Sequence, residues 1–228
     1  MRFSIPLLKF LFRIQKTFKL QPILAKQFYK PEGLLGRVAI DFMAVANKPV
    51  YNWAVNFLEL KNTDHVLEIG FGHGVYVKKI AEKVADGFVA GVDISADMVR
   101  QASLLNQKMI SAGRVALFQN ELNPMPFADD FFDSILAVNV IYFWPNPEKE
   151  LLEINRVLKP GGRAVMYLTD KESLKQLPFT GDALFTKYDG EEFAAVIKKT
   201  GFAKTEVQTR IFSFKDAEIT GHCVVATK

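Results

Sequence analysis

Cysteine and long apolar runs are both scarce in this sequence, and their scarcity narrows the classes of protein that it can encode. Cys223 is the single cysteine among 228 residues, so no intrachain disulfide and no all-cysteine zinc site can form. The longest run without a charged residue has 14 residues, 134–147, whereas a membrane span needs roughly 20 apolar residues. We therefore expect a protein of a reducing compartment, the cytoplasm, without a transmembrane helix.

Several catalytic signatures are absent as well. The three histidines, His65, His73 and His222, include no pair at metal-binding spacing. The sequence has no phosphate-binding Gly-Lys-Ser motif and no Ser, His and Asp set typical of a hydrolase. Hydrolytic, NTP-driven and metal-dependent chemistry therefore have no support, and we expect no metal site.

Acidic residues are missing from the first 31 positions. This segment holds seven of the 29 Lys and Arg and none of the 25 Asp and Glu, so it carries a charge of +7 and the remaining 197 residues carry −3. A helix here would place Leu7, Leu11 and Phe18 on one face and Lys9 and Arg13 on the other. Three interpretations stay open: packing on the domain that follows, contact of residues 1–20 with an anionic membrane surface, or an organelle transit peptide.

The rest of the chain predicts an α/β fold. Residues 32–60 are helical in pattern, and in residues 61–228 strand-like and helix-like segments alternate. This alternation predicts a seven-stranded, mostly parallel sheet with helices on both faces, behind an N-terminal helical extension. The last two strands follow each other without a helix, which predicts an antiparallel edge hairpin. Strands are expected at 66–69, 88–93, 115–119, 134–140, 163–169, 204–214 and 222–226, and helices at 76–84, 96–112, 147–158 and 190–200.

A glycine loop follows the first predicted strand. Gly70, Gly72 and Gly74 let a ligand approach the backbone, and the helix that follows offers free N–H groups. Glu68, just before the loop, suits a ligand with a cationic group, and Asp93, at the end of the next strand, can accept both hydroxyls of a ribose. The glycine spacing departs from the dinucleotide fingerprint, which makes a dehydrogenase a distant alternative.

Two further motifs complete a set in which the chain resembles the class I S-adenosylmethionine-dependent methyltransferases. The matching segments are 68–74, 91–98, 125–133 and 156–163. The resemblance implies S-adenosylmethionine as cofactor, with the three glycines under its methionine part, Glu68 near its ammonium group and Asp93 on its ribose. It implies that Glu121 accepts the adenine amino protons, with Asn120 as an alternative, and that the Leu122 N–H faces the ring. The cofactor-binding residues expected in this way are Glu68, Gly70, Gly72, Gly74, Asp93, Ile94, Met98, Glu121, Leu122 and Asn139.

The resemblance leaves the methyl acceptor open, and the residues favour a small, hydrophobic or lipid-like one. Tyr142, Phe143 and Trp144 follow the fourth strand, where the family lines its acceptor pocket. A body of net charge −3 gives little support for binding a nucleic acid. Tyr142, Tyr76 and Asp170 are candidates to orient the acceptor or to take a proton from it.

Helices ahead of the first strand commonly cover the cofactor in this family, so we expect residues 32–60 to be a lid. Tyr29, Asn47 or Asn52 would then lie near the ligand. A monomer or homodimer in the cytoplasm or at the membrane surface is expected. The alternative function is a regulatory protein of the same fold that binds S-adenosylmethionine without turnover.

Overall fold

A single sheet of seven strands runs through the computed structural model, which describes residues 21–144, 146–180, 184–214 and 217–228. The strands are β1 (His65–Ile69), β2 (Phe88–Asp93), β3 (Val115–Gln119), β4 (Phe132–Val138), β5 (Leu158–Thr169), β6 (Lys204–Phe214) and β7 (Ala217–Thr227). Their order is β3-β2-β1-β4-β5-β7-β6. The chain therefore leaves β1 in one direction for β2 and β3 and crosses back to β4, which makes the carboxyl end of β1 the switch point of the sheet.

The first five strands are parallel, and the last two are antiparallel. β7 lies between β5 and β6 and pairs antiparallel with both. The predicted α/β fold with its edge hairpin is confirmed, and the last strand lies inside the sheet while β6 forms its edge.

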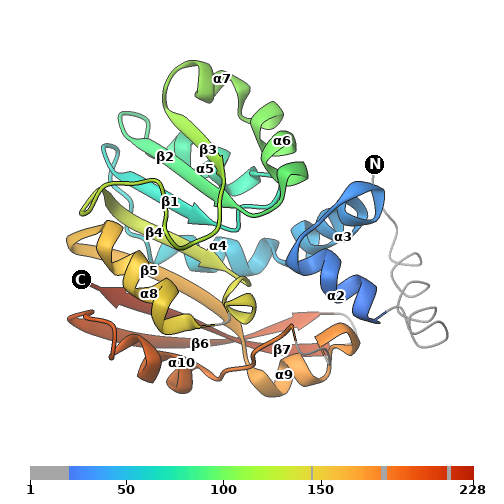
Figure 1. Ribbon diagram of the computed structural model, residues 1–228. Coiled ribbons are helices and arrows are strands. Elements are labelled where there is room, and N and C mark those ends of the chain that lie inside the picture. Colours follow the sequence, from blue (N-terminus) through green and yellow to red (C-terminus); the bar gives the residue numbers. More distant parts are fainter. Residues whose placement is uncertain (1–20, 145, 181–183, 215–216) are drawn as a thin grey trace.

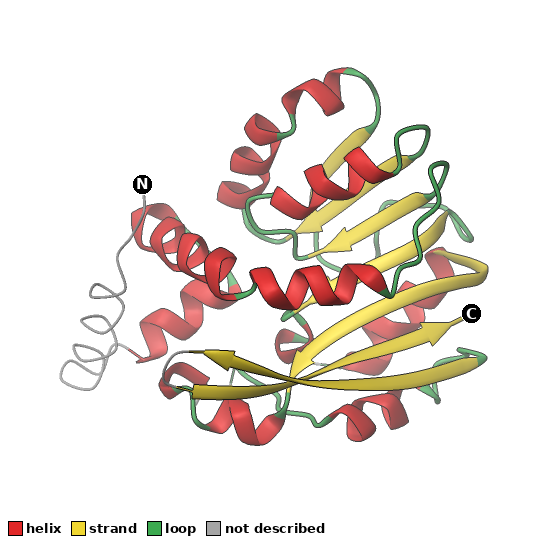
Figure 2. Cartoon of the chain, turned by 180° about the vertical axis from the view of Figure 1, so that it is seen from behind, coloured by secondary structure: helices red, strands yellow, loops and turns green. Residues whose placement is uncertain are grey.

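Helices cover both faces of the sheet. The helices are α2 (Gln21–Tyr29), α3 (Gly33–Ala46), α4 (Lys48–Asn56), α5 (Val75–Lys83), α6 (Ala96–Leu105), α7 (Gln107–Ser111), α8 (Pro147–Val157), α9 (Lys171–Lys175) and α10 (Gly190–Ile197), with short 3₁₀ turns η1 (Ile141–Phe143) and η2 (Pro178–Thr180). Figure 1 shows α8 and α10 on one face, and the reverse view in Figure 2 shows α4 crossing the other. In both views α2 and α3 stand beside the edge to which the parallel strands point.

The alternation of side chains along β1 explains both layers. Leu67 and Ile69 belong to the core under α8 and α10, whereas Val66 belongs to the core under α4, α5 and α6. Because side chains of a strand alternate between faces, Glu68 falls on the side of Val66. An acid is thus carried into an otherwise apolar layer, at the switch point.

Two predicted helices are interrupted. The helix expected at 96–112 breaks at Asn106, whose Nδ2 donates hydrogen bonds to the carbonyl oxygens of Ala102 (2.9 Å) and Gly74 (3.1 Å). The side chain thus ties the break to the glycine loop. The helical segment after residue 32 breaks at Asn47, which lies between α3 and α4.

β5 starts earlier than expected. The residues 159–162, predicted to be a tight connection between a helix and a strand, are part of β5, with a register shift against β4. Gly161 N–H donates to the Lys228 carbonyl (2.8 Å), and Lys228 N–H donates to that of Gly162 (3.1 Å). These glycines therefore join the beginning of β5 to the residue that follows β7.

The basic helix predicted before residue 20 lies outside the described residues. Pro22 lies in the first turn of α2, where a proline costs no hydrogen bond. In the described part of the chain, no helix is long and apolar enough to cross a membrane.

Candidate functional site

Glu68 is a buried acid without a donor. It is 1% exposed, and no donor of the described residues forms a hydrogen bond with either of its carboxylate oxygens. Burial raises the pKa of Glu68 to about 8, against a lowering by the nearby Tyr51 hydroxyl and with a further rise from Asp93. A buried polar group of this kind costs free energy unless a partner satisfies it. The position therefore favours a ligand that brings a cationic hydrogen-bond donor.

The glycine loop keeps the backbone open beside Glu68. Gly70, Gly72 and Gly74 all have positive φ angles, of 68°, 56° and 76°. A Cβ at Gly70 would lie 2.2 Å from Val140 Cγ1, and one at Gly74 would lie 2.6 Å from a methyl carbon of α6, so protein packing alone requires these two glycines. At Gly72 the nearest atom would be Ile40 Cγ2, at 3.7 Å. Gly72 is thus the glycine at which the loop leaves room for a ligand.

Asp93 lies at the end of β2 and holds the same loop. Its Oδ2 accepts a hydrogen bond from Gly72 N–H (3.0 Å), and its Oδ1 accepts one from Ser95 N–H (2.9 Å). Burial raises the pKa of Asp93 to about 6, although the two backbone donors lower it. A carboxylate has about four acceptor positions, so two remain for the hydroxyls of a ligand.

Neither of the two acids is neutralised by a basic side chain in the part of the chain that the structure describes. Within the described ranges, neither Glu68 nor Asp93 forms an ion pair with a lysine, arginine or histidine. The carboxyl ends of β1 and β2 thus hold two carboxyl groups that have no counterion among the described residues. A molecule with a positive group at one end and a diol further along fits this pattern. The glycine loop between the two acids leaves room for the part of the molecule that joins them.

α3 covers the loop. Ile40 of α3 lies over Gly72, and His73 Nε2 is 4.0 Å from Asp41 Oδ1. Burial lowers the pKa of His73, against a rise from Asp41. The segment before α3 reaches the same region, because Ser95 Oγ donates to the Pro31 carbonyl (2.6 Å). The loop and the start of α6 therefore lie under residues 31–41.

Comparison with known proteins decides the family. A model of the family described as methyltransferase domain matches residues 67–166. The uncharacterized methyltransferase YdaC of Bacillus subtilis is 28% identical over 171 residues, which cover 75% of this chain and 89% of that protein. The ubiquinone/menaquinone biosynthesis C-methyltransferase UbiE of Geotalea daltonii is 28% identical over 181 residues, 68% of this chain and 77% of its own length. The chain belongs to the class I S-adenosylmethionine-dependent methyltransferases.

Solved structures agree on the fold of the methyltransferase. A chain in the complex between the Haloferax volcanii Trm112 methyltransferase activator and the putative methyltransferase superposes with a TM-score of 0.70. The sequence identity is 18%, and the match covers 82% of this chain and 92% of that one. S-adenosylmethionine is the cofactor of the family, and its sulfonium methyl supplies the reactivity. Its ammonium group is a donor of the kind that the Glu68 carboxyl, unpartnered among the described residues, could accept, and its ribose hydroxyls are donors for the remaining acceptor positions of Asp93.

Tyr51 is a residue of this site that the sequence analysis missed. It comes from α4, and its ring stacks on that of Tyr76 with 4.1 Å between centroids and 12° between planes. Burial raises the pKa of Tyr51 well above its usual range, and Glu68 raises it further. The hydroxyl lies beside Glu68 without reaching hydrogen-bond geometry. Its only signal in the sequence was its place in a helix ahead of β1, which does not single it out among neighbouring polar residues.

Tyr76, a predicted catalytic candidate, is the ring on which Tyr51 stacks. Its hydroxyl donates to Asn52 Oδ1 at 3.0 Å, and the Lys48 carbonyl is 3.2 Å away. Burial raises the pKa of Tyr76, and Glu68 adds to the rise. The structure thus places Tyr76 and the expected lid residue Asn52 together, on the α4 side of Glu68.

Asn139 and Tyr142 form a second polar group at the end of β4. Asn139 has a φ of 58°, a left-handed conformation that asparagine tolerates. Its Nδ2 donates to Asn47 Oδ1 (3.0 Å), and its Oδ1 accepts from the Tyr142 hydroxyl (2.8 Å). The same hydroxyl accepts from Thr169 N–H, and burial raises the pKa of Tyr142 far above its usual range. This group connects α3 and α4 to β4 and β5, so Asn47 bridges the expected lid and the sheet.

Asp170 lies at the end of β5 with its carboxylate already bound. Its Oδ1 accepts from the N–H groups of Glu172 (2.9 Å) and Ser173 (3.4 Å), which caps α9, and its Oδ2 is 3.2 Å from His222 Nε2. Burial alone would raise the pKa of Asp170, but these partners hold it below its usual value. The described contacts of Asp170 are thus those of a helix cap and of a partner to His222.

The residues expected around the adenosine are spread along the β2 and β3 ends. Ile94 is half-buried, whereas Met98 is buried in the core and its N–H donates to Ser95 Oγ (3.3 Å). Glu121 is exposed and Leu122 is half-buried, in the loop that follows β3. Asn120, the alternative to Glu121, uses its Nδ2 to bind the carbonyls of Glu121 (2.6 Å) and Pro124 (2.8 Å). Asn120 therefore shapes this loop.

An aromatic cluster lies beyond the end of β4. Phe143 packs against Tyr29 of α2 (5.4 Å between centroids) and against Phe185 (4.9 Å), and Phe179 packs against Phe28 of α2 (4.6 Å). Trp144, expected beside Tyr142 and Phe143 in an acceptor pocket, is buried instead against Phe193 of α10. The aromatic cluster, defined as Phe28, Tyr29, Tyr142, Phe143, Phe179 and Phe185, contains no charged side chain.

Proposed function

We propose that this methyltransferase transfers the methyl group of S-adenosylmethionine to a small hydrophobic or lipid-like acceptor. The observation that carries the proposal is the uncharged aromatic cluster, which lies at the end of β4 next to Asn139. Apolar rings favour an apolar molecule, because a polar one would lose its hydration there. UbiE, named for ubiquinone and menaquinone biosynthesis, is a relative whose name points to an acceptor of this class.

We further propose a division of work among the residues at the switch point. Glu68, aided by Tyr51, binds the ammonium group of the cofactor, Asp93 binds the ribose, and the Gly72 backbone passes beneath the chain that joins them. Ile94, Met98, Glu121, Leu122 and Asn139 would complete the cofactor pocket around the adenosine and the reactive end.

The chemistry asks mainly for alignment. The bond from sulfur to the methyl carbon breaks as the acceptor atom bonds to that carbon, and alignment of the two can contribute roughly 7 to 11 kcal/mol. α3 and α4 would act as the lid: Ile40 lies over the loop, and Asn47 ties the helices to β4. A closed lid excludes water and completes the acceptor pocket.

A product assay with a paired variant tests the acceptor class. The protein is incubated with S-adenosylmethionine and either a prenylated quinol, a water-soluble amine or an oligonucleotide, and S-adenosylhomocysteine is measured by mass spectrometry. We expect turnover with the quinol. Phe143→Leu should raise KM for it severalfold and leave cofactor affinity unchanged, whereas Phe131→Leu, in an aromatic group at the other end of β4, should change neither. Turnover with the amine or the oligonucleotide alone would contradict the proposal.

We also propose peripheral contact with an anionic membrane through residues 1–20, which would bring a lipid-like acceptor to the site. Exposed apolar side chains at the start of α3 support this proposal: Leu34 is 77% and Leu35 is 63% exposed. The test is flotation with vesicles that contain an anionic lipid. Leu7→Asp combined with Leu11→Asp should abolish binding, whereas Leu104→Asp, at a leucine of α6 that is 70% exposed, should not. Equal binding of all three proteins would contradict membrane contact at residues 1–20.

A further inference from the structure

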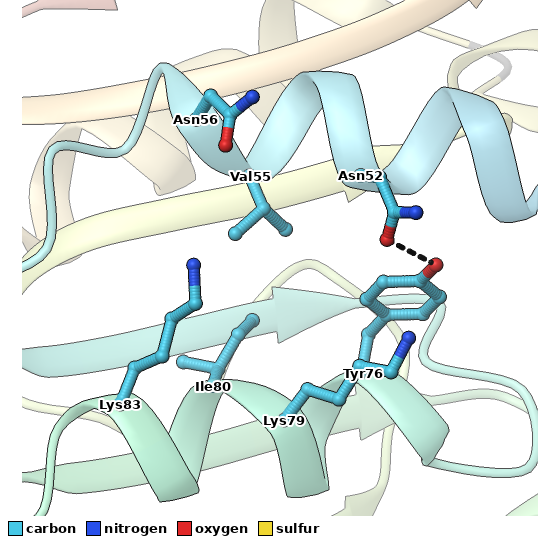
Figure 3. Close-up of a pocket in the computed structure, with 7 residues that line it drawn as sticks. All are labelled: Asn52, Val55, Asn56, Tyr76, Lys79, Ile80 and Lys83. Atoms are coloured by element: carbon cyan, nitrogen blue, oxygen red, sulfur yellow. Dashed lines mark hydrogen bonds between the residues drawn. The ribbon is translucent and has the colours of Figure 1, made fainter.

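A groove separates α4 from α5 on the face of the sheet that carries Glu68. Its volume is about 280 Å³, and Figure 3 shows that α5 forms one side and α4 the other. Lys83 extends from α5 towards α4, Lys79 extends to the Tyr76 ring, and Asn52 and Asn56 line the groove from α4. Two cations and two carboxamides thus line one groove from two separate elements.

The two lysines have no carboxylate to neutralise them. None of the seven residues that line the groove is acidic, and in the described ranges neither lysine takes part in an ion pair. The Lys79 ammonium is held 4.2 Å above the centre of the Tyr76 ring, a contact that leaves its N–H groups able to donate. The groove therefore offers two cationic donors without an ion-pair partner in the described ranges, of which Lys79 is held against the Tyr76 ring.

The remaining lining is apolar. Val55 and Ile80 form the floor between the two helices, and the Tyr76 ring closes one end. A volume of about 280 Å³ is at the small end of ligand pockets, which hold roughly 300 to 1,000 Å³. The groove suits an oxyanion that carries a short apolar part.

The charge count selects the oxyanion. A carboxylate would neutralise one of the two lysines, whereas a phosphate monoester carries about 1.5 to 2 negative charges at pH 7 and three acceptor oxygens. We propose that the groove between α4 and α5 is a second ligand site, for a small phosphomonoester, with the phosphate between Lys79 and Lys83 and the organic part on Val55 and Ile80. This site is separate from the cofactor pocket, from which the Tyr76 and Tyr51 rings divide it, and it does not depend on the identity of the methyl acceptor.

Calorimetric titration with butyl phosphate tests the proposal, with butyrate as the carboxylate of similar tail, at constant ionic strength. Butyl phosphate should bind saturably with one site per chain. Lys79→Met and Lys83→Met should each weaken it about tenfold, the loss expected for one charge-assisted hydrogen bond. Lys78→Met is the matched control, because Lys78 is exposed and, at 100° per residue, on the side of α5 away from the groove. It should leave the dissociation constant within about twofold.

Four outcomes would overturn the proposal. The first is no saturable heat with butyl phosphate, and the second is equal weakening by Lys78→Met. Butyrate that binds as tightly as butyl phosphate would remove the phosphate specificity. Displacement of butyl phosphate by saturating S-adenosylhomocysteine would place it in the cofactor pocket. Thermal melting of each variant confirms that the fold is retained, as expected for lysines that are half-buried (Lys79) or exposed (Lys78 and Lys83).

Discussion

Binding of the cofactor should release a proton from Glu68 at neutral pH. Burial raises the pKa of this carboxyl to about 8, so in the free protein at pH 7 it is about nine-tenths protonated. An ammonium group placed against it would favour the carboxylate and lower the pKa well below 7. The same calculation gives a release of about 0.9 proton per cofactor at pH 7 and about 0.1 at pH 9. Asp93, with a pKa of about 6, contributes only about 0.1 proton at pH 7.

The assay is titration calorimetry with S-adenosylhomocysteine, which keeps the ammonium and the ribose, in two phosphate-free buffers of different ionisation enthalpy. The difference in observed enthalpy between the buffers gives the number of protons released. Glu68→Gln should abolish the release and weaken binding, whereas Glu82→Gln, at a position near the end of α5 outside the site, should keep both. Equal enthalpies in the two buffers for the wild-type protein at pH 7 would refute the reasoning, because Glu68 would then be ionised before the cofactor arrives.

Four further predictions concern the same region. Glu68→Gln should raise the free energy of unfolding at pH 9. The shift of the pKa from 4.5 to about 8 destabilises the folded wild-type protein by about 5 kcal/mol above pH 8, and this cost grows from pH 4.5 upwards and vanishes below it. Urea unfolding at pH 5 and pH 9 measures the difference in stability between variant and wild type, and equal differences at the two pH values would contradict the assignment. Gly72→Ala and Gly113→Ala should each lose about 1 kcal/mol of stability, since both glycines have positive φ. Only Gly72→Ala should lose cofactor affinity, and a similar loss of affinity in both variants would contradict the ligand role of the loop. Tyr51→Phe should weaken cofactor binding by about threefold to tenfold and move the midpoint of proton release above pH 8, because the Tyr51 hydroxyl lowers the pKa of Glu68. An unchanged midpoint in calorimetry would show that Tyr51 does not act on Glu68. Asp170→Asn should keep turnover within about threefold, because its backbone contacts are those of a cap that asparagine also makes and its other contact is with His222. A loss of over a hundredfold in kcat would identify Asp170 as a proton acceptor instead.

The sequence predicted the sheet well because strand and loop signals were local. Glu68 and Asp93 stand at strand ends next to glycine or to a helix start, and parallel strands bring such ends to one edge of a sheet. The mostly parallel sheet followed from the alternation of strands and helices, and the edge hairpin followed from the missing helix before β7.

The parts that escaped prediction depend on contacts between distant segments. Tyr51 gained its place beside Glu68 because α4 packs across β4 and β5, and no local pattern marks that packing. Asn106 breaks a helix by binding Gly74, 32 residues away. Trp144 looked like a pocket residue from its neighbours, but the turn at η1 directs it into the core against α10.

The position of β7 has a consequence for how the chain reaches its fold. β6 touches the rest of the sheet only through β7, with which it pairs along its whole length. During synthesis β6 leaves the ribosome before β7, so it has no sheet edge to join until β7 has been made. The first five strands and their helices can assemble earlier, since each pairs with a strand already present. Ligand-binding loops at the switch point would thus form on the nascent chain, while the β5 edge waits, unpaired and open to wrong partners, for the final hairpin.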